Sequence, residues 1–394
     1  MTTDLRKPTM ENTHKLSIAI IFGGRSGEHE VSLMSARSVL SVLDRNRYEV
    51  IEIGITHSGA WLTGKNALAA FEQGKTESLF RASLLPDPSR PGLVVLEMQN
   101  SDPQGTYSGI TAAPKETTIS VDVFFPVLHG TFGEDGSIQG LFEMADTAYV
   151  GSGVVGSCVG MDKGVFKDVM IANNIPVVKS TMALRSEIDQ NMDAIIKRAE
   201  AVSDYPLFIK PANLGSSVGV TKCQTRADIV EGLMEASLYD RRVLIEQGVH
   251  NPREIEVSVL GNENPVASVP GEIIPGADFY SYDAKYLLNT SELRIPAPLS
   301  EAKAMQFQTL AVKAYKAIDC CGMARVDFLL DSQTEEIFLN EINTIPGFTK
   351  ISMYPKLWEA SGLPYSALVD RLIELALERK ADRNRSVHQF RRDQ

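Results

Sequence analysis

The chain of 394 residues lacks the patterns that mark several large classes of protein. Its four cysteines form no C-x-x-C pair and show no spacing typical of a disulfide framework. No apolar run approaches the roughly 20 residues that a membrane helix needs, and the polar first 15 residues lack the apolar core of a secretory signal. We therefore expect a cytoplasmic protein with reduced thiols and no membrane partner.

The chain also lacks an excess of basic residues. It has 39 basic and 50 acidic residues and a net charge of −11. This balance argues against binding nucleic acid by general electrostatic attraction, while it leaves room for a local basic pocket for phosphates. The sequence contains neither the G-x-x-x-x-G-K-[ST] loop nor the G-x-G-x-x-G fingerprint, which argues against a P-loop protein and a dinucleotide-dependent oxidoreductase.

The first third of the chain alternates strands and helices. Apolar runs predict strands at 16–22, 48–55 and 121–127, and helical spacing predicts a helix at 29–43. This order predicts an α/β N-terminal domain with a parallel sheet. We place it at 15–152 after a flexible segment 1–14, with an insertion at about 60–118. Its part from 85 to 118, rich in Pro, Ser, Gly and Thr, is expected to be an extended loop or a hairpin.

The remainder predicts two α+β domains, a central one at 153–262 and a C-terminal one at 263–379. The tail from 380 to 394 is charged and is expected to be frayed. The central domain should begin with one helix and continue as a compact antiparallel unit, whereas the C-terminal domain should begin with a polar loop. The expected central elements are a helix at 154–173, strands at 206–211, 217–221, 243–246 and 254–260, and a helix at 226–236. The expected C-terminal elements are a loop at 271–300, a helix at 307–318, a hairpin and a helix at 366–379.

The predicted C-terminal hairpin carries a group of oxygen ligands. Its strands, 324–330 and 337–343, are separated by a polar turn. Side chains alternate along a strand, so one face holds Arg325 and Asp327, and Glu341 and Asn343 likewise share a face. Carboxylate and amide oxygens suit Mg²⁺, and an arginine beside them could neutralise a phosphoryl oxygen or a developing oxyanion. Carboxylates taken alone favour the alternative, an edge hairpin whose polar face meets water.

Two other segments have the composition of a nucleotide site. Lys210 stands at a strand end before a loop of small residues, which can present N–H groups and hydroxyls to an anion. A turn with a solvated lysine is the alternative. Glu246 and Glu254 flank a turn between two strands, where a carboxylate could accept the hydroxyls of a ribose, although surface glutamates are common.

The segment 23–30 resembles a phosphate-binding turn but carries Glu28 and Glu30 at the start of a helix. These acids would repel a pyrophosphate and favour a cation such as an ammonium group; alternatively, they only complement the helix dipole, each by about 0.3–1 kcal/mol. Residues 280–286 hold three tyrosines and a lysine. They indicate either a lid or aromatic rings packed on the domain surface.

Taken together, these segments resemble the D-alanine–D-alanine ligases of the ATP-grasp superfamily. Six blocks match in the expected order and span about 16–355. The resemblance implies an ATP-grasp fold of three parts, with ATP between the last two. It also implies a reaction that forms D-alanyl-D-alanine through an acyl phosphate, for peptidoglycan precursor synthesis. The blocks are residues 23–32, 129–140, 161–163, 210–219, 282–286 and 325–347.

The resemblance also implies roles for residues at the ATP site. Two lysines would hold the phosphates, a third would reach the γ-phosphate from a lid, and further residues would bind adenine, ribose and two Mg²⁺ ions, with Mn²⁺ as an alternative ion. These are Lys163 and Lys210 for phosphates, Ser217 for a further nucleotide contact, Lys285 for the γ-phosphate, Glu246 and Val249 for adenine, Glu254 for ribose, and Asp327, Glu341 and Asn343 for the metal. Arg325 and the Gly347 N–H would stabilise the tetrahedral oxyanion.

The remaining implied roles concern the two amino acids. Glu28, bonded to Ser216 and Tyr286, would pair with the ammonium of the first D-alanine, and His129 would lie near this substrate. Ser352 and the Met353 backbone, helped by Lys285, would bind the carboxylate of the second.

The acceptor and the assembly are further expectations. Tyr286 keeps the dipeptide-forming pattern, which favours D-alanine as acceptor, and the family implies a homodimer. The alternatives are a D-lactate or D-serine ligase of the same superfamily, and a nucleotide-binding ATP-grasp module without ligase activity.

Overall fold

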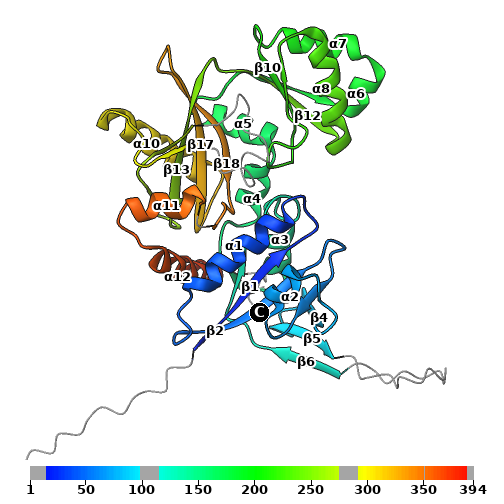
Figure 1. Cartoon of the computed structure of the whole chain (residues 1–394), viewed down its shortest axis with the longest axis vertical. Helices are drawn as coiled ribbons and strands as arrows, with labels where there is room; N and C mark the ends of the chain where they lie inside the picture. Colours follow the sequence, from blue (N-terminus) through cyan, green and yellow to red (C-terminus); the bar gives the residue numbers. More distant parts are fainter. Residues whose placement is uncertain (1–14, 98–114, 275–291, 350, 388–394) are drawn as a thin grey trace, which may run out of the picture.

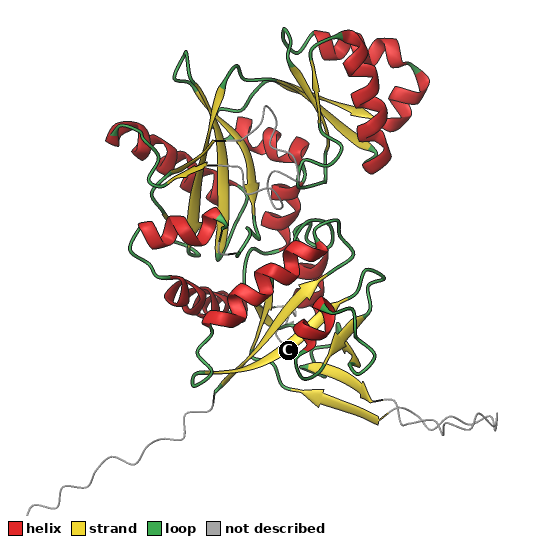
Figure 2. Cartoon of the chain, viewed as in Figure 1, coloured by secondary structure: helices red, strands yellow, loops and turns green. Residues whose placement is uncertain are grey.

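The computed structural model describes residues 15–97, 115–274, 292–349 and 351–387. These described residues form three sheets. The N-terminal sheet lies at one end of the long axis and the middle sheet at the other, with the C-terminal sheet between and beside them (Figures 1 and 2). The mixed α/β and α+β class expected from the sequence is confirmed. No helix in these ranges combines the length and apolar character needed to cross a membrane.

The N-terminal sheet has eight strands and a parallel centre. β1 (Leu16–Gly23) runs parallel to β2 (Tyr48–Ile55) and to β7 (Val123–Pro126), and β7 runs parallel to β8 (Ala148–Tyr149). These pairings, and α1 (His29–Val42), confirm the predicted strand–helix–strand opening. The other helices of this part are α2 (Ala67–Glu72) and α3 (Ser137–Met144).

The insertion extends this sheet. Four strands continue it from β2 in antiparallel pairs, and β5 and β6 form the hairpin expected near 85–118. The sheet is therefore mixed, not purely parallel. Residues 98–114 lie outside the described ranges. The added strands are β3 (Trp61–Thr63), β4 (Phe80–Leu84), β5 (Leu93–Glu97) and β6 (Lys115–Ile119).

The middle sheet is antiparallel, as predicted, and has the order β11-β10-β12-β9. Its strands are β9 (Ser180–Leu184), β10 (Leu207–Pro211), β11 (Thr221–Cys223) and β12 (Arg242–Gln247), and its helices are α6 (Arg185–Gln190), α7 (Met192–Glu200) and α8 (Arg226–Tyr239). The predicted strand at 217–221 was wrong, because β11 begins only at Thr221. Ser216 and Ser217 have φ of 50° and 58°, a left-handed conformation that a strand does not allow.

The predicted helix at 154–173 is two helices, α4 (Val154–Met161) and α5 (Lys163–Ala172). Asp162 breaks it with an extended backbone, φ −80° and ψ 101°. Its carboxylate accepts hydrogen bonds from the N–H groups of Gly164 (3.1 Å) and Val165 (2.9 Å), and so caps α5. The break places Lys163 at the beginning of the second helix.

The strand predicted at 254–260 does not belong to the middle sheet. It is β13 (Pro252–Leu260), and it pairs along its whole length with β17 (Met323–Asp331) of the C-terminal sheet. Its apolar side chains explain this, since Ile255 and Val257 are buried in one core with Phe328. Phe166 of α5 is buried in the same core, so the expected central domain 153–262 contributes to two sheets.

The C-terminal sheet has the order β16-β15-β13-β17-β18, with β14 paired to β13. The predicted hairpin is confirmed as β17 and β18 (Ile337–Asn343), and the predicted helices as α10 (Glu301–Ala317) and α12 (Tyr365–Arg383). The loop predicted at 271–300 is wrong at 271–274 and at 292–294, where two paired strands form, while 275–291 lie outside the described residues. The remaining elements are β14 (Val266–Ala267), β15 (Gly271–Ile274), β16 (Glu292–Arg294) and α11 (Met353–Ala360).

Helix α12 returns to the N-terminal sheet. Leu368 and Leu372 are buried in one core with Ile20 and Phe125, and Figure 1 shows α12 beside α1. The helix continues to Arg383, beyond the predicted start of a frayed tail.

The extension of α12 has an electrostatic cause. Arg383 bonds Glu143 at 2.6 Å, and Lys380 pairs with Asp146, so the basic side chains are held by carboxylates of the N-terminal part. Residues 388–394 lie outside the described ranges.

Candidate active site

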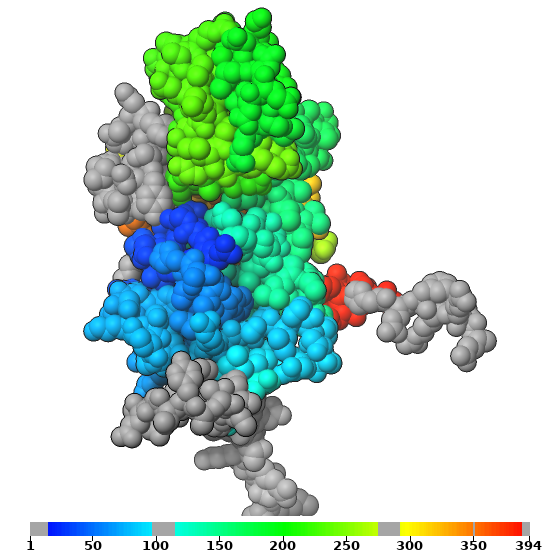
Figure 3. Space-filling view, turned by 90° about the vertical axis from the view of Figure 1, so that its right-hand side faces the viewer, coloured from blue at the N-terminus to red at the C-terminus, as the bar shows by residue number. Residues whose placement is uncertain are grey.

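A cavity of about 520 Å³ lies where the three parts of the chain meet. In the space-filling view the middle unit (green) stands above the N-terminal part (blue to cyan) (Figure 3). The cavity is lined by every predicted site residue that the structure describes. These are Glu28, His129, Lys163, Lys210, Ser216, Ser217, Glu246, Val249, Glu254, Arg325, Asp327, Glu341, Asn343, Gly347, Ser352 and Met353. The other two, Lys285 and Tyr286, lie outside the described residues.

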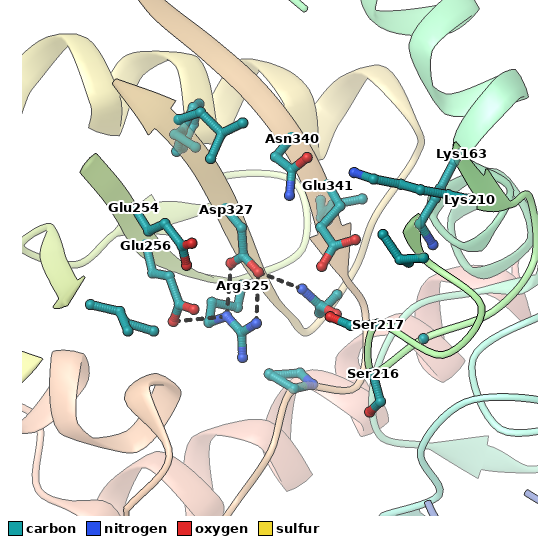
Figure 4. Close-up of a pocket in the computed structure, with 18 of the residues that line it drawn as sticks. Lys163, Lys210, Ser216, Ser217, Glu254, Glu256, Arg325, Asp327, Asn340 and Glu341 are labelled. Atoms are coloured by element: carbon teal, nitrogen blue, oxygen red, sulfur yellow. Dashed lines mark hydrogen bonds and ion pairs between the residues drawn. The ribbon is translucent and has the colours of Figure 1, made fainter. Parts of the chain in front are cut away.

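Three adjacent strands bring a row of carboxylates to one wall of the cavity. Asp327 on β17 pairs with Glu256 on β13 and with Glu341 on β18. Burial alternates along β17, with Arg325 and Asp327 partly exposed between buried neighbours, so these two side chains share a face, as predicted. Figure 4 shows the row with Arg325 below it.

Arg325 joins two of these carboxylates. Its Nε and Nη2 donate hydrogen bonds of 2.7 and 2.6 Å to Asp327, and its Nε lies 2.9 Å from Glu256 Oε2. Asn343 Nδ2 donates a further bond of 2.9 Å to Asp327 Oδ2. One guanidinium thus faces a row of three carboxylates, which leaves this wall net negative and suited to cations.

A β-bulge shapes the end of the wall that carries Glu341. The register shifts between Asp327 and Phe328, which pair with Glu341 and Leu339, so Asn340 has no partner across the strand. Consequently the consecutive residues Asn340 and Glu341 are both partly exposed, and both line the cavity. Sequence reasoning missed Asn340, because a regular strand would turn it away from Glu341.

The opposite wall is basic. Both oxygens of the buried Glu246 are paired, one with Lys210 and the other with Lys167 at 3.1 Å. Burial opposes the charge of Glu246, but the two lysines lower its pKa to about 2. Burial likewise opposes the charge of Lys210, yet Glu246 raises its pKa, so this lysine stays charged. Lys167 was missed, although it stands one helical turn from Lys163.

The loop after β10 closes the space between the two walls. Lys163 Nζ donates a hydrogen bond of 2.7 Å to Leu214 O, and Ser216 Oγ donates one to Glu28. The left-handed backbone of Ser216 and Ser217 costs roughly 1 kcal/mol or more per residue. The bond to Glu28 helps to hold this strained turn against the N-terminal part.

Two residues of the glycine-rich segment 129–136, His129 and Glu134, line the cavity. Gly130 has φ 72°, and a Cβ there would lie 2.5 Å from Glu28 Oε2, so glycine is required for this close approach. His129 is buried, with Nδ1 donating to Ile345 O (3.0 Å) and Nε2 accepting from Ser35 Oγ (2.9 Å). Burial lowers the pKa of His129, which keeps the ring neutral.

Glu134 in the same segment was not anticipated. It lines the cavity and accepts hydrogen bonds from the N–H groups of Gly130 (2.8 Å) and Ile345 (3.2 Å). Burial and the nearby Glu28 raise the pKa of Glu134 to about 8. Glu256 was also missed, although it stands two residues after Glu254 and therefore on the same strand face.

A different cluster of possible metal ligands lies outside the cavity. His29, Glu30 and His57 offer ligand atoms within 4.8 Å of one another. The two imidazole rings are stacked, however, with centroids 3.8 Å apart and planes inclined by 18°. Imidazole lone pairs lie in the ring plane, so those of two nearly parallel rings do not converge on one ion. We assign no role to this cluster.

Comparisons with known proteins point to one family. The family model described as D-ala D-ala ligase N-terminus matches residues 17–152, and the one described as D-ala D-ala ligase C-terminus matches 169–374. The chain is 48% identical over 373 residues to the D-alanine--D-alanine ligase of Heliobacterium modesticaldum, which covers 95% of this chain and 98% of the relative. It is 46% identical to that of Natranaerobius thermophilus, with 95% and 99% covered.

Solved structures are similar as well. The D-alanine-D-alanine ligase of Coxiella burnetii has a TM-score of 0.77 and 34% identity, with 94% of this chain and 96% of that chain covered. The VanG D-Ala:D-Ser ligase of Enterococcus faecalis has a TM-score of 0.79 and 35% identity, with 92% and 100% covered. The two family models together span most of the chain, and the relatives match nearly end to end. The chain therefore belongs to the D-alanine–D-alanine ligase family, and its fold is the ATP-grasp fold.

Proposed function

We propose that this chain joins two D-alanine molecules, at the expense of ATP, to form D-alanyl-D-alanine for peptidoglycan precursor synthesis. The observation that carries the proposal is the cavity itself. It sets a basic wall, Lys163 and Lys210, across from an acidic wall that carries Arg325, with Glu28 beside both. Phosphates, metal ions and a substrate ammonium can each meet a group of opposite charge in one enclosed space.

The basic wall binds the nucleotide. Lys163 and Lys210 bind its phosphates as point charges, and Ser217 adds a hydroxyl. Glu254 on β13 accepts the ribose hydroxyls, while Val249 and Glu246 border the adenine. Because both oxygens of Glu246 are paired with lysines, it acts chiefly by holding Lys210 in place.

The acidic wall fits Mg²⁺. Asp327, Glu341 and Asn343 provide hard oxygen ligands on paired strands, and the row holds three carboxylates against one arginine. When bound, two Mg²⁺ ions, or Mn²⁺, neutralise the phosphate oxygens during transfer. Arg325 gives the wall a cation of its own, which stays near Asp327 and reaches toward developing negative charge.

The two amino-acid substrates bind near Glu28 and near the start of α11. Glu28 binds the ammonium of the first D-alanine, supported by the hydrogen bond from Ser216 and by Tyr286, and His129 borders this substrate. Ser352 and the Met353 N–H, at the N-terminus of α11, bind the carboxylate of the second D-alanine, with Lys285. Ser352 is already ordered by the N–H and hydroxyl of Thr349, at 3.1 and 2.8 Å.

The chemistry proceeds in two transfers. A carboxylate oxygen of the first D-alanine attacks the γ-phosphorus, the bond to the bridging oxygen breaks, and ADP leaves. The amine of the second D-alanine then attacks the acyl carbon and loses a proton. The tetrahedral intermediate expels phosphate, and the peptide bond remains. Arg325 and the Gly347 N–H stabilise the oxyanion of this intermediate.

A product assay tests the proposal. Purified protein is incubated with ATP, Mg²⁺ and D-alanine, phosphate release is followed, and the product is identified by mass spectrometry. D-alanyl-D-alanine with one phosphate per dipeptide is expected. ADP formation that does not respond to D-alanine would instead support a nucleotide-binding module without ligase activity.

A D-serine or D-lactate acceptor is the second candidate, because the fold also matches a D-Ala:D-Ser ligase. Equimolar D-alanine, D-serine and D-lactate in one reaction decide between them, and a predominant mixed product would replace our assignment. We further propose a homodimer in the cytoplasm, and sedimentation velocity at several concentrations tests the dimer.

A further inference from the structure

The Gly347 N–H, the proposed oxyanion donor, lies in the segment between β18 and α11. Within the described residues this N–H makes no hydrogen bond of its own. A Cβ at Gly347 would lie 2.7 Å from Ser352 Oγ, so the backbone is pressed against the start of α11. The direction of the N–H therefore depends on what holds the residues on either side.

Ile345, two residues before Gly347, is held at both of its backbone polar groups. Ile345 N–H donates to Glu134 Oε1 at 3.2 Å, and Ile345 C=O accepts from His129 Nδ1 at 3.0 Å. Both side chains come from the segment 129–136 of the N-terminal part. Glu134 also accepts the Gly130 N–H at 2.8 Å, so one carboxylate ties this segment to the C-terminal part.

The residue on the other side of Gly347 is held in the same way. Phe348 N–H donates to Ser35 Oγ at 3.4 Å, and Phe348 C=O accepts from Tyr365 Oη at 3.0 Å. Ser35 belongs to α1 and also bonds His129 Nε2. The donor therefore sits between two backbone anchors that other parts of the chain provide.

We propose that Glu134 is a positioning residue that, together with His129 and Ser35, aims the Gly347 N–H at the tetrahedral oxyanion. This inference rests on the proposed ligase function and on the oxyanion role of Gly347. Glu134 acts through Ile345 and touches no reacting atom. The N-terminal part thus contributes to catalysis through the backbone of the C-terminal part.

The physical reason lies in the precision that an oxyanion donor needs. A donor stabilises the transition state only at about 2.7–3.1 Å from the oxyanion, and a displacement of about 1 Å can cost a hundredfold in rate. Pro346 has no N–H, so the segment lacks one of the bonds that could hold it internally. The bonds from Glu134 and His129 to the backbone of Ile345, which we call the clamp, replace that missing restraint.

The test uses Glu134→Gln in the full chain. Glutamine keeps the size but offers one acceptor oxygen, so it can satisfy either Gly130 or Ile345 and not both. Assayed above about pH 8, where Glu134 is charged, the loss of a charge-assisted hydrogen bond at this point should lower kcat roughly ten- to hundredfold. KM for ATP and KM for D-alanine should change less than threefold or so, because the oxyanion exists only after binding.

A phosphinate analogue of the dipeptide gives an independent readout. Its tetrahedral centre carries an anionic oxygen in the place of the oxyanion, so its affinity should fall with kcat. A merely structural effect would weaken the analogue and the substrates alike.

The matched control is Asp135→Asn, the next acid in the same turn. Asp135 accepts hydrogen bonds from the N–H groups of Phe132 and Ser137, at 2.9 and 3.0 Å, and forms no hydrogen bond with the described residues 344–348. Its kcat should stay within about twofold of the parent. An equal loss in both variants would overturn the clamp, as would a parent-like kcat in Glu134→Gln.

Ser35→Ala provides a second variant if Glu134→Gln does not fold. It removes the acceptor for Phe348 N–H and should lower kcat with little change in either KM. Parent-like kcat in this variant would also contradict the clamp. An inactive parent protein would instead refute the proposed function, so the two failures are distinguishable.

Discussion

Arg325 and Asp327, two residues apart on β17, are joined by two hydrogen bonds of 2.7 and 2.6 Å that occupy both oxygens of the aspartate. The proposed oxyanion-binding cation and the proposed metal ligand are therefore one ion pair. Strand alternation causes this, because residues i and i+2 point to the same face. A change of charge at either residue therefore alters the electrostatic environment of the other.

The first prediction concerns the arginine fork. Arg325→Lys keeps the charge but loses the planar pair of donors, and kcat should fall by roughly tenfold or more while ATP affinity changes little. Arg325→Ala should cost about a hundredfold or more. Steady-state kinetics and calorimetric ATP binding measure both. Arg253→Lys serves as the control, because Arg253 forms a similar forked pair with Glu272 outside the cavity. An unchanged kcat in Arg325→Lys would contradict the role of the planar donor pair.

The second prediction concerns metal binding. Asp327→Asn removes one charge from the carboxylate row, so the Mg²⁺ concentration for half-maximal activity should rise about tenfold or more. The measurement is a Mg²⁺ titration at saturating ATP. Glu336→Gln, in the exposed turn of the same hairpin, should leave the titration unchanged. A parent-like titration in Asp327→Asn would remove this residue from the metal site.

The third prediction concerns the stability of the basic wall. Glu246→Gln leaves the buried Lys167 and the partly buried Lys210 without their shared counter-ion and should cost roughly 3–5 kcal/mol in unfolding free energy. Urea unfolding measures this loss. Asp193→Asn, which removes one partner of the exposed pair with Arg226, should change the midpoint little. Equal midpoints for the two variants would contradict a structural role for Glu246.

The same carboxylate gives a pH dependence of stability. The pKa of Glu246 is lowered from its ordinary 4.5 to about 2 in the folded chain. Its contribution is therefore present above pH 4.5 and is lost as the pH falls from about 4.5 to 2. Glu246→Gln should flatten the stability curve in this window, and an unchanged slope there would argue against the lowered pKa.

A further prediction concerns the pH dependence of the reaction. Burial, and then Glu28, raise the pKa of Glu134 to about 8, while Arg325 opposes this shift and the neighbouring His129 is neutral. The carboxylate accepts both N–H groups fully, whereas the protonated group turns one oxygen into a hydroxyl. Consequently kcat should increase as the pH rises through about 8. This limb should be absent in Glu134→Gln, and its persistence there would assign it to another group.

Local chemistry made much of the site predictable. The i, i+2 spacing of Arg325 and Asp327 placed both on one face of a strand, and burial along β17 follows that alternation. The lysine at the end of β10 and the small-residue loop after it also line the cavity as expected. These features depend on strand geometry and residue type, which a sequence displays directly.

Other features depended on packing between distant segments. The strand containing Glu254 joins β17 because Ile255 and Val257 are buried with Phe328, about 70 residues later in the chain. The bulge that exposes Asn340 arises from pairing with β17 and has no local signal. Glu134 was invisible as a functional residue because its partner Ile345 lies 211 positions away.

The amino-acid sequence by itself determined the class of fold, the order of the motifs and the chemical types that the site contains. Periodicity and residue chemistry are properties of short segments, so they can be recognised without knowledge of the fold. Only the tertiary structure decided which charges neutralise one another, namely Arg325 with Asp327 and Glu256, and Glu246 with two lysines. Pairing depends on distances between segments, and those distances are set by the packing of the three sheets.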